Sequence, residues 1–151
     1  MIYYRNDVRR SGVDGRALVA TAKQLMASVG EGDAALSLSL VGDGAMRALN
    51  REYRGRDAPT DVLSFPLDGA PEAAGSERLL GDVVISVDTA RRQAAAYRAP
   101  LQRELYRLLI HGVLHLKGHD HVAVAERRAM EREERRLAAA ISLPWPYAAN
   151  R

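Results

Sequence analysis

The chain has 151 residues, 47% of them hydrophobic and 27% charged, which is typical of one folded domain and excludes a disordered chain. It has no cysteine, so disulfides and thiolate metal sites are excluded, and nitrogen or oxygen ligands must hold any metal. The net charge is +3, and 22 basic residues that include only two lysines favour a phosphate-bearing partner weakly.

The first third of the chain predicts alternating strands and helices. A short strand is expected near Ile2–Arg5, followed by a helix within residues 14–30, where apolar residues recur at helical spacing up to Gly30. Residues 34–42 alternate leucine with serine, the pattern of a half-buried strand. Asp43 is then expected to cap a helix that runs to about Tyr53.

The remaining segments predict two strands and then three helices. Residues 61–67 and 79–87 have strand character, and the polar stretch 68–78 between them predicts an exposed, mobile loop. Helices are expected within residues 88–98, within 100–118 with Pro100 in the first turn, and within 123–142. The mixed charges of the last helix predict a solvated face.

These elements predict one domain over residues 1–151, with no repeat and no linker. The fold class is α/β (α+β), a small mixed four-stranded sheet packed with about five helices.

All four histidines lie in the stretch HGVLHLKGHDH, residues 111–121. On a helix, His111 and His115 lie one turn apart and point the same way, so they can chelate one ion. Gly118 can end that helix in a left-handed conformation and bring His121 back over the pair. The spacing predicts a three-histidine metal site, whereas His119 lies in the turn and is not expected to be a ligand.

Three histidines leave one coordination position open, as in catalytic zinc sites. Zinc lowers the pKa of bound water towards about 7, so hydrolysis is the expected chemistry. Asp120 is expected either to complete a closed site or, preferably, to accept a ring N–H from a ligand. The alternative is that His111 and His115 are core histidines of an apolar helix.

The same spacing occurs in the metzincin motif H-E-x-x-H-x-x-G-x-x-H, where the glutamate is the general base. Gly112 occupies that position here, which disfavours a peptidase. We expect Gly112→Glu to bind metal, to lose activity on phosphate esters and to gain no proteolysis, because a carboxylate beside the metal repels phosphate.

A second polar stretch, residues 50–66, offers Arg54 and Arg56 in a loop that leads into a strand. Arginine can hold a phosphate or a carboxylate, and a solvent-facing basic turn is the alternative.

In these two stretches the chain resembles a known family, the YbeY endoribonucleases, which mature ribosomal RNA. The family signature H-G-x-L-H-L-x-G-x-D-H is met over residues 111–121, and Y-R-G-x-D-x-P-T-D-V-L-S-F-P is met from Tyr53 to Pro66. GDVVIS, residues 81–86, is similar to a third signature.

The resemblance implies one zinc ion on His111, His115 and His121, with Arg54 and His115 as catalytic residues. Asp120, Arg56 and Ser64 are expected to support the ligands or the substrate. The expected activity is a zinc-dependent, single-strand-specific endoribonuclease in 3′-end maturation of ribosomal RNA and in ribosome quality control.

The expected partners are single-stranded or ribosomal RNA and the small ribosomal subunit, with no DNA. Neither a signal peptide nor a membrane-spanning run of roughly 20 apolar residues is evident, so a cytoplasmic protein without a membrane partner is expected. The alternatives are a metal-dependent hydrolase of another substrate, such as a metzincin-like peptidase, and a non-catalytic ribosome-assembly factor with a structural metal.

Overall fold

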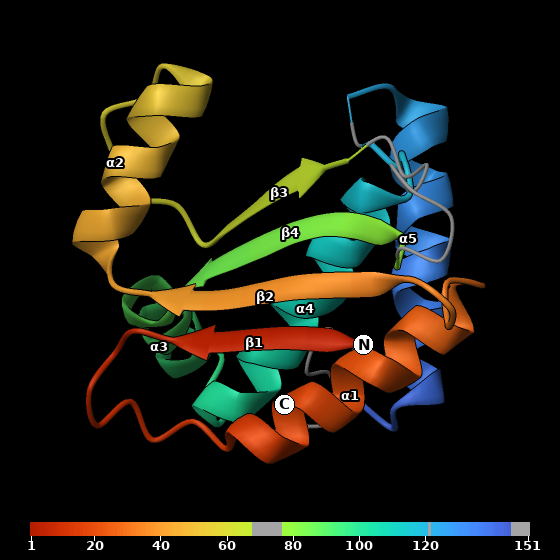
Figure 1. The fold of residues 1–151 in the computed structure, drawn as a ribbon, viewed down its shortest axis with the longest axis horizontal. Helices are drawn as coiled ribbons and strands as arrows, with labels where there is room; N and C mark the ends of the chain where they lie inside the picture. The colour runs from red at the N-terminus through yellow and green to blue at the C-terminus, as the bar shows by residue number, and fades with distance from the viewer. Residues whose placement is uncertain (68–76, 121, 146–151) are drawn as a thin grey trace.

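The computed structural model describes residues 1–67, 77–120 and 122–145. The predicted loop at residues 68–78 therefore lies outside the described residues, apart from its last two positions. The described residues form nine elements in chain order (Figure 1): β1 Ile2–Asn6, α1 Gly15–Ser28, β2 Ala35–Val41, α2 Asp43–Arg54, β3 Val62–Pro66, β4 Leu79–Ser86, α3 Val87–Ala96, α4 Leu101–Leu116 and α5 Val124–Ala140.

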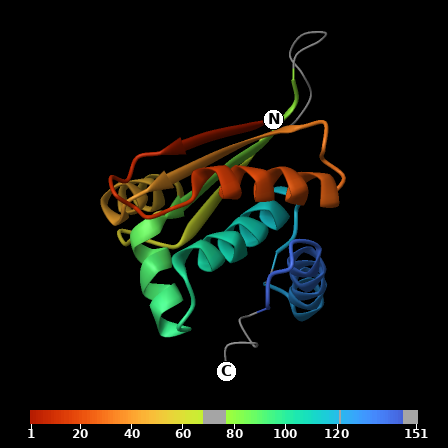
Figure 2. The ribbon, with the colours of Figure 1, turned by 90° about the horizontal axis from the view of Figure 1, so that it is seen from below.

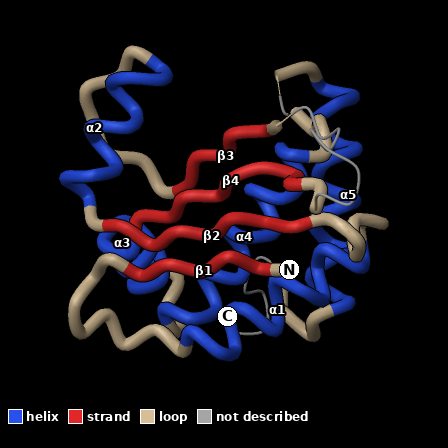
Figure 3. The backbone as a smooth tube through the Cα atoms, in the orientation of Figure 1, coloured by secondary structure: helices blue, strands red, loops and turns tan. Residues whose placement is uncertain are grey.

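The four strands form one mixed sheet in the order β1-β2-β4-β3 (Figure 3). The pairs β1–β2 and β2–β4 are parallel, whereas β3 runs antiparallel to β4 at one edge of the sheet. The five helices and the mixed sheet confirm the predicted fold class. None of the helices in the described ranges is long and apolar enough to span a membrane.

Four helices, α1, α3, α4 and α5, lie on the same face of the sheet (Figure 2). The leucines of β2 point into the core between sheet and helices, and Leu36, Leu38 and Leu40 are fully buried, as the alternation with serine predicts. A smaller apolar cluster lies at the end of the sheet near α2, where Met46 packs with Leu63 and Val84. This packing fixes α2, and with it the start of the loop into β3.

The ends of the helices follow local rules in most places. Asp14 accepts a hydrogen bond from the Ala17 N–H and caps α1, and Gly30 follows that helix with φ +78°. The prediction that Asp43 caps α2 is wrong, because the capping residue is Gly42 and Asp43 lies inside the first turn. Likewise, Pro100 immediately precedes α4 instead of lying in its first turn.

The Asp43 side chain instead contacts the start of α3. Its carboxylate accepts hydrogen bonds of 2.7 Å from the Ser86 and Thr89 hydroxyls and pairs with Arg92. In return, the Asp88 carboxylate accepts a hydrogen bond from the Asp43 backbone N–H. Each helix thus supplies a carboxylate to the amino-terminal end of the other.

Candidate functional site

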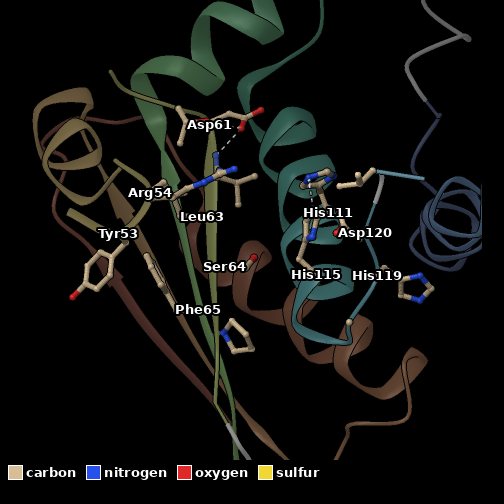
Figure 4. A pocket seen from close by; sticks show the side chains of 15 residues that line it. Tyr53, Arg54, Asp61, Leu63, Ser64, Phe65, His111, His115, His119 and Asp120 are labelled. Carbon is tan, nitrogen blue, oxygen red and sulfur yellow. Dashed lines mark hydrogen bonds between the residues drawn. The ribbon is translucent and has the colours of Figure 1, made fainter. Parts of the chain in front are cut away.

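A cleft of about 850 Å³ lies between β3 and the carboxyl-terminal end of α4. One side is formed by the end of α2 and by β3, with Tyr53, Arg54 and Phe65, and the other carries His111 and His115 (Figure 4). Residues that the sequence separates by more than forty positions therefore face the same space.

His111 and His115 lie on the last turns of α4, with their Nε2 atoms 3.0 Å apart. Two nitrogen ligands of one tetrahedral zinc ion are separated by about 3.3 Å when each Zn–N distance is about 2.05 Å. The two rings therefore present their nitrogens much as a shared ion requires. They are half-buried and line the cleft, so the interpretation of them as core histidines is wrong.

The outer nitrogen of His111 faces a carboxylate. Glu134 Oε2, on α5, lies 3.6 Å from His111 Nδ1, and the Glu134 side chain is only 12% exposed. Metal-ligating histidines commonly turn their second nitrogen to a carboxylate, which sets the ring orientation and raises its basicity. Sequence analysis missed Glu134, because it assigned the charged run of α5 to solvent.

The turn after α4 begins as predicted. Gly118 has φ +91°, and the His119 backbone N–H donates to the Leu114 carbonyl. His119 and Asp120 both line the cleft. The third predicted ligand, His121, lies outside the described residues, and within the part that is described no three histidine, aspartate or glutamate side chains gather as a metal site.

The donor set of this cleft nevertheless fits zinc. The described residues supply two convergent imidazoles on one helix face and a carboxylate behind one of them. His111 and His115 would hold the ion, and His121 remains the predicted third ligand.

Gly112 is buried where α4 packs against β4, next to Ser64 of the cleft lining. A Cβ atom there would lie 2.8 Å from Val83 Cγ1 and 3.2 Å from the Ser64 hydroxyl oxygen. Metal binding by Gly112→Glu stays a prediction, and the new side chain would have to displace Val83 on β4. The glycine is needed for close helix–sheet contact.

Ser64 lines the cleft from β3, and its hydroxyl donates a 2.9 Å hydrogen bond to the Gly112 carbonyl. Its observed role is thus to join β3 to α4 beside the histidines. Arg56 is exposed and does not belong to the cleft lining.

Arg54 is the last residue of α2, and Gly55 ends the helix with φ +69°. The following loop is tied back to α2 by a bidentate pair in which Arg47 donates to Asp57 at 2.7 and 2.9 Å. These hydrogen bonds lower the pKa of the Asp57 carboxyl. The Asn50 amide also donates to a carbonyl of the loop. Arg54, which makes no hydrogen bond or ion pair with another described residue, extends into a cleft with a fixed rim.

The fold and the cleft define a single-domain α/β protein with a histidine pair facing an arginine. A family profile described as Endoribonuclease YbeY matches residues 4–142, and the chain belongs to that family.

Curated relatives described as endoribonuclease YbeY are similar over most of this chain. The one from Anaeromyxobacter sp. is 53% identical over 85% of this chain, which spans 65% of that relative's length. The one from Pelotomaculum thermopropionicum is 48% identical over 83% of this chain and 85% of its own length. Among solved structures, the solution structure of TM1509 from Thermotoga maritima has a TM-score of 0.63 at 25% identity, covering 99% of this chain and 95% of that one.

Proposed function

We propose that this protein is a zinc-dependent, single-strand-specific endoribonuclease that acts in 3′-end maturation of ribosomal RNA and in ribosome quality control. The observation that carries the proposal is the histidine pair of α4 facing Arg54 across one cleft. The curated relatives are described as endoribonucleases, which supports RNA as the substrate.

In this proposal, zinc supplies a Lewis acid for the phosphodiester and makes water more acidic. His111 and His115 hold the ion, His121 completes the ligand set, and Glu134 keeps the His111 ring turned toward His115. Arg54 places its guanidinium on phosphate oxygens and offsets the charge that develops there. Ser64 holds β3 against α4, so Arg54 and the histidines keep their separation. Asp120 is proposed to support the ligands from the turn.

The position of the cleft favours a single strand over a duplex. The cleft lies between the edge strand and a helix end, and its rim carries aromatic side chains on which an unpaired base can stack. Ribosomal RNA, the small ribosomal subunit and a cytoplasmic location belong to the same proposal and follow from the family resemblance.

The peptidase alternative loses support from Gly112. In metzincins the position after the first histidine carries a base, whereas here it faces Val83 in the packing between α4 and the sheet. The chain therefore lacks the carboxylate that a metzincin uses at this position.

The test compares wild type with His115→Ala in three measurements: zinc content by elemental analysis, melting temperature, and cleavage of one RNA sequence offered as single strand and as duplex. We expect about one zinc ion per wild-type chain and cleavage of the single strand only. His115→Ala should lose zinc and cleavage while remaining folded. Loss of folding along with zinc would support the assembly factor with a structural metal, and casein cleavage by wild type would support a peptidase.

A further inference from the structure

Tyr53 is an exposed aromatic residue on the rim of the cleft. It is 61% exposed, although the chain has only six tyrosines, one phenylalanine and one tryptophan. The single phenylalanine, Phe65, lies beside it with ring centroids 5.1 Å apart and planes at 66°, an edge-to-face pair (Figure 4). Two of eight aromatic rings thus gather at one side of the cleft.

The backbone holds this aromatic pair in place. Tyr53 belongs to the last turn of α2, whose end is capped by Gly55 and tied down by the Arg47–Asp57 ion pair. Phe65 belongs to β3, which is hydrogen-bonded to β4. A tyrosine ring has only two side-chain torsions, so holding it against a ligand costs little conformational entropy.

The neighbours of the pair indicate which ligand it contacts. Arg54 adjoins Tyr53 in sequence and lines the same cleft, so a cationic phosphate ligand stands next to an open aromatic face. A phosphate group and a flat ring in succession are what a nucleotide presents, and proteins bind single strands by this combination of charge and stacking. A peptide offers no such regular alternation.

We propose that Tyr53, supported by Phe65, is a stacking site for one nucleobase of the RNA strand whose phosphate Arg54 contacts. The site rests on the proposed ribonuclease function and adds a subsite to it. Every base has a π face, so the site binds a base of any identity and selects unpaired over paired nucleotides. Tyr53 acts in binding, and the histidines and Arg54 act on the phosphate.

The experiment measures cleavage of one RNA strand and of versions that each lack the base at one position. Tyr53→Ala removes the ring, Tyr53→Phe keeps it, and Tyr53→Leu keeps an apolar contact with Phe65 without a π face. Tyr97→Ala is the matched control, because Tyr97 is 47% exposed and does not line the cleft. Melting temperatures verify that each variant is folded.

For wild type we expect one position at which loss of the base raises KM. Tyr53→Ala should raise KM for intact RNA by about 5-fold or more, with little change in kcat. In the Tyr53→Ala variant, removal of that base should not raise KM any further. Tyr53→Phe should remain near wild type and Tyr53→Leu should resemble Tyr53→Ala.

An equal effect of Tyr53→Ala on intact RNA and on every RNA lacking a base would overturn the stacking site. So would an unchanged KM in a Tyr53→Ala variant that cleaves RNA. Failure of wild type to cleave any RNA would instead overturn the proposed function itself, so the two failures are distinguishable.

Discussion

Glu134 Oε2 lies 3.6 Å from His111 Nδ1, so a carboxylate of α5 faces the ring nitrogen of His111 that points away from His115. The pair joins α5 to the face of α4 that carries His111 and His115.

Replacing Glu134 with glutamine should weaken zinc binding by about 10-fold, because an amide cannot raise the basicity of the imidazole as a carboxylate does. Competition with a chromophoric chelator measures this affinity directly. Glu133→Gln is the matched control. It removes the same charge at the adjacent position, where the Glu133 side chain pairs with Arg136 and not with a histidine. Equal zinc affinities for the two variants would contradict the role of Glu134.

Replacing Arg54 with alanine should lower kcat/KM for single-stranded RNA by about 100-fold and leave the zinc content intact, because the proposed role of Arg54 is to contact phosphate and not the metal. Arg54→Lys should restore activity only in part, since lysine keeps the charge but lacks the planar fork. Arg56→Ala serves as control and should cleave like wild type. If Arg54→Ala retains full activity, Arg56 becomes the candidate for the phosphate contact.

Gly112→Ala should destabilise the protein by about 1–2 kcal/mol, because overpacking against Val83 costs more than the gain in helix propensity. Gly44 offers the matched control within α2: apart from its chain neighbours and the backbone of its own helix, no atom lies within 4 Å of the Cβ position there, so Gly44→Ala should be neutral or stabilising. Urea unfolding of both variants measures the difference. A destabilised Gly44→Ala together with a neutral Gly112→Ala would show that space between α4 and β4 is not the constraint.

The Asp43 carboxyl should make stability depend on pH. Burial alone would raise its pKa, but hydrogen bonds from Thr89, Ser86 and Arg92 together lower it below its ordinary value of 3.8. A group whose pKa is lower in the folded state stabilises the protein above its unfolded pKa, and this contribution is lost as the pH falls through the folded pKa.

The free energy of unfolding of Asp43→Asn should therefore be lower than that of wild type at about pH 6, and the difference should shrink below about pH 4. Chemical denaturation at a series of pH values measures it. A difference that stays constant down to about pH 2 would show that the charge of Asp43 is not what stabilises the two helix ends.

The elements could be predicted because each depends on local pattern. Leucine alternates with serine along β2, and the apolar residues of α1 recur at helical spacing, so the buried faces of both follow from period alone. His111 and His115 belong to the same class, since four residues on a helix always return to one face.

The contacts between elements could not be predicted in this way. Glu134 contacts His111 only because α5 packs against α4 near His111. No spacing within α5 distinguishes Glu134 from the exposed Glu131. Aspartate is a preferred residue at the start of a helix, but the amino-terminal end of α3 lies close enough to Asp43 to bind its carboxylate instead. The cleft position of Tyr53 likewise depends on β3 being the edge strand.

The order of the sheet has a consequence for synthesis of the chain. The strand β3 is made before β4, its only partner among the described strands, and Arg54 is made well before the histidines of α4. Because chains fold from the amino terminus as they emerge, a growing chain that ends before α4 carries Arg54 without the histidines that are proposed to hold the metal. The proposed nuclease activity therefore requires the second half of the domain to be translated before any RNA can be cut.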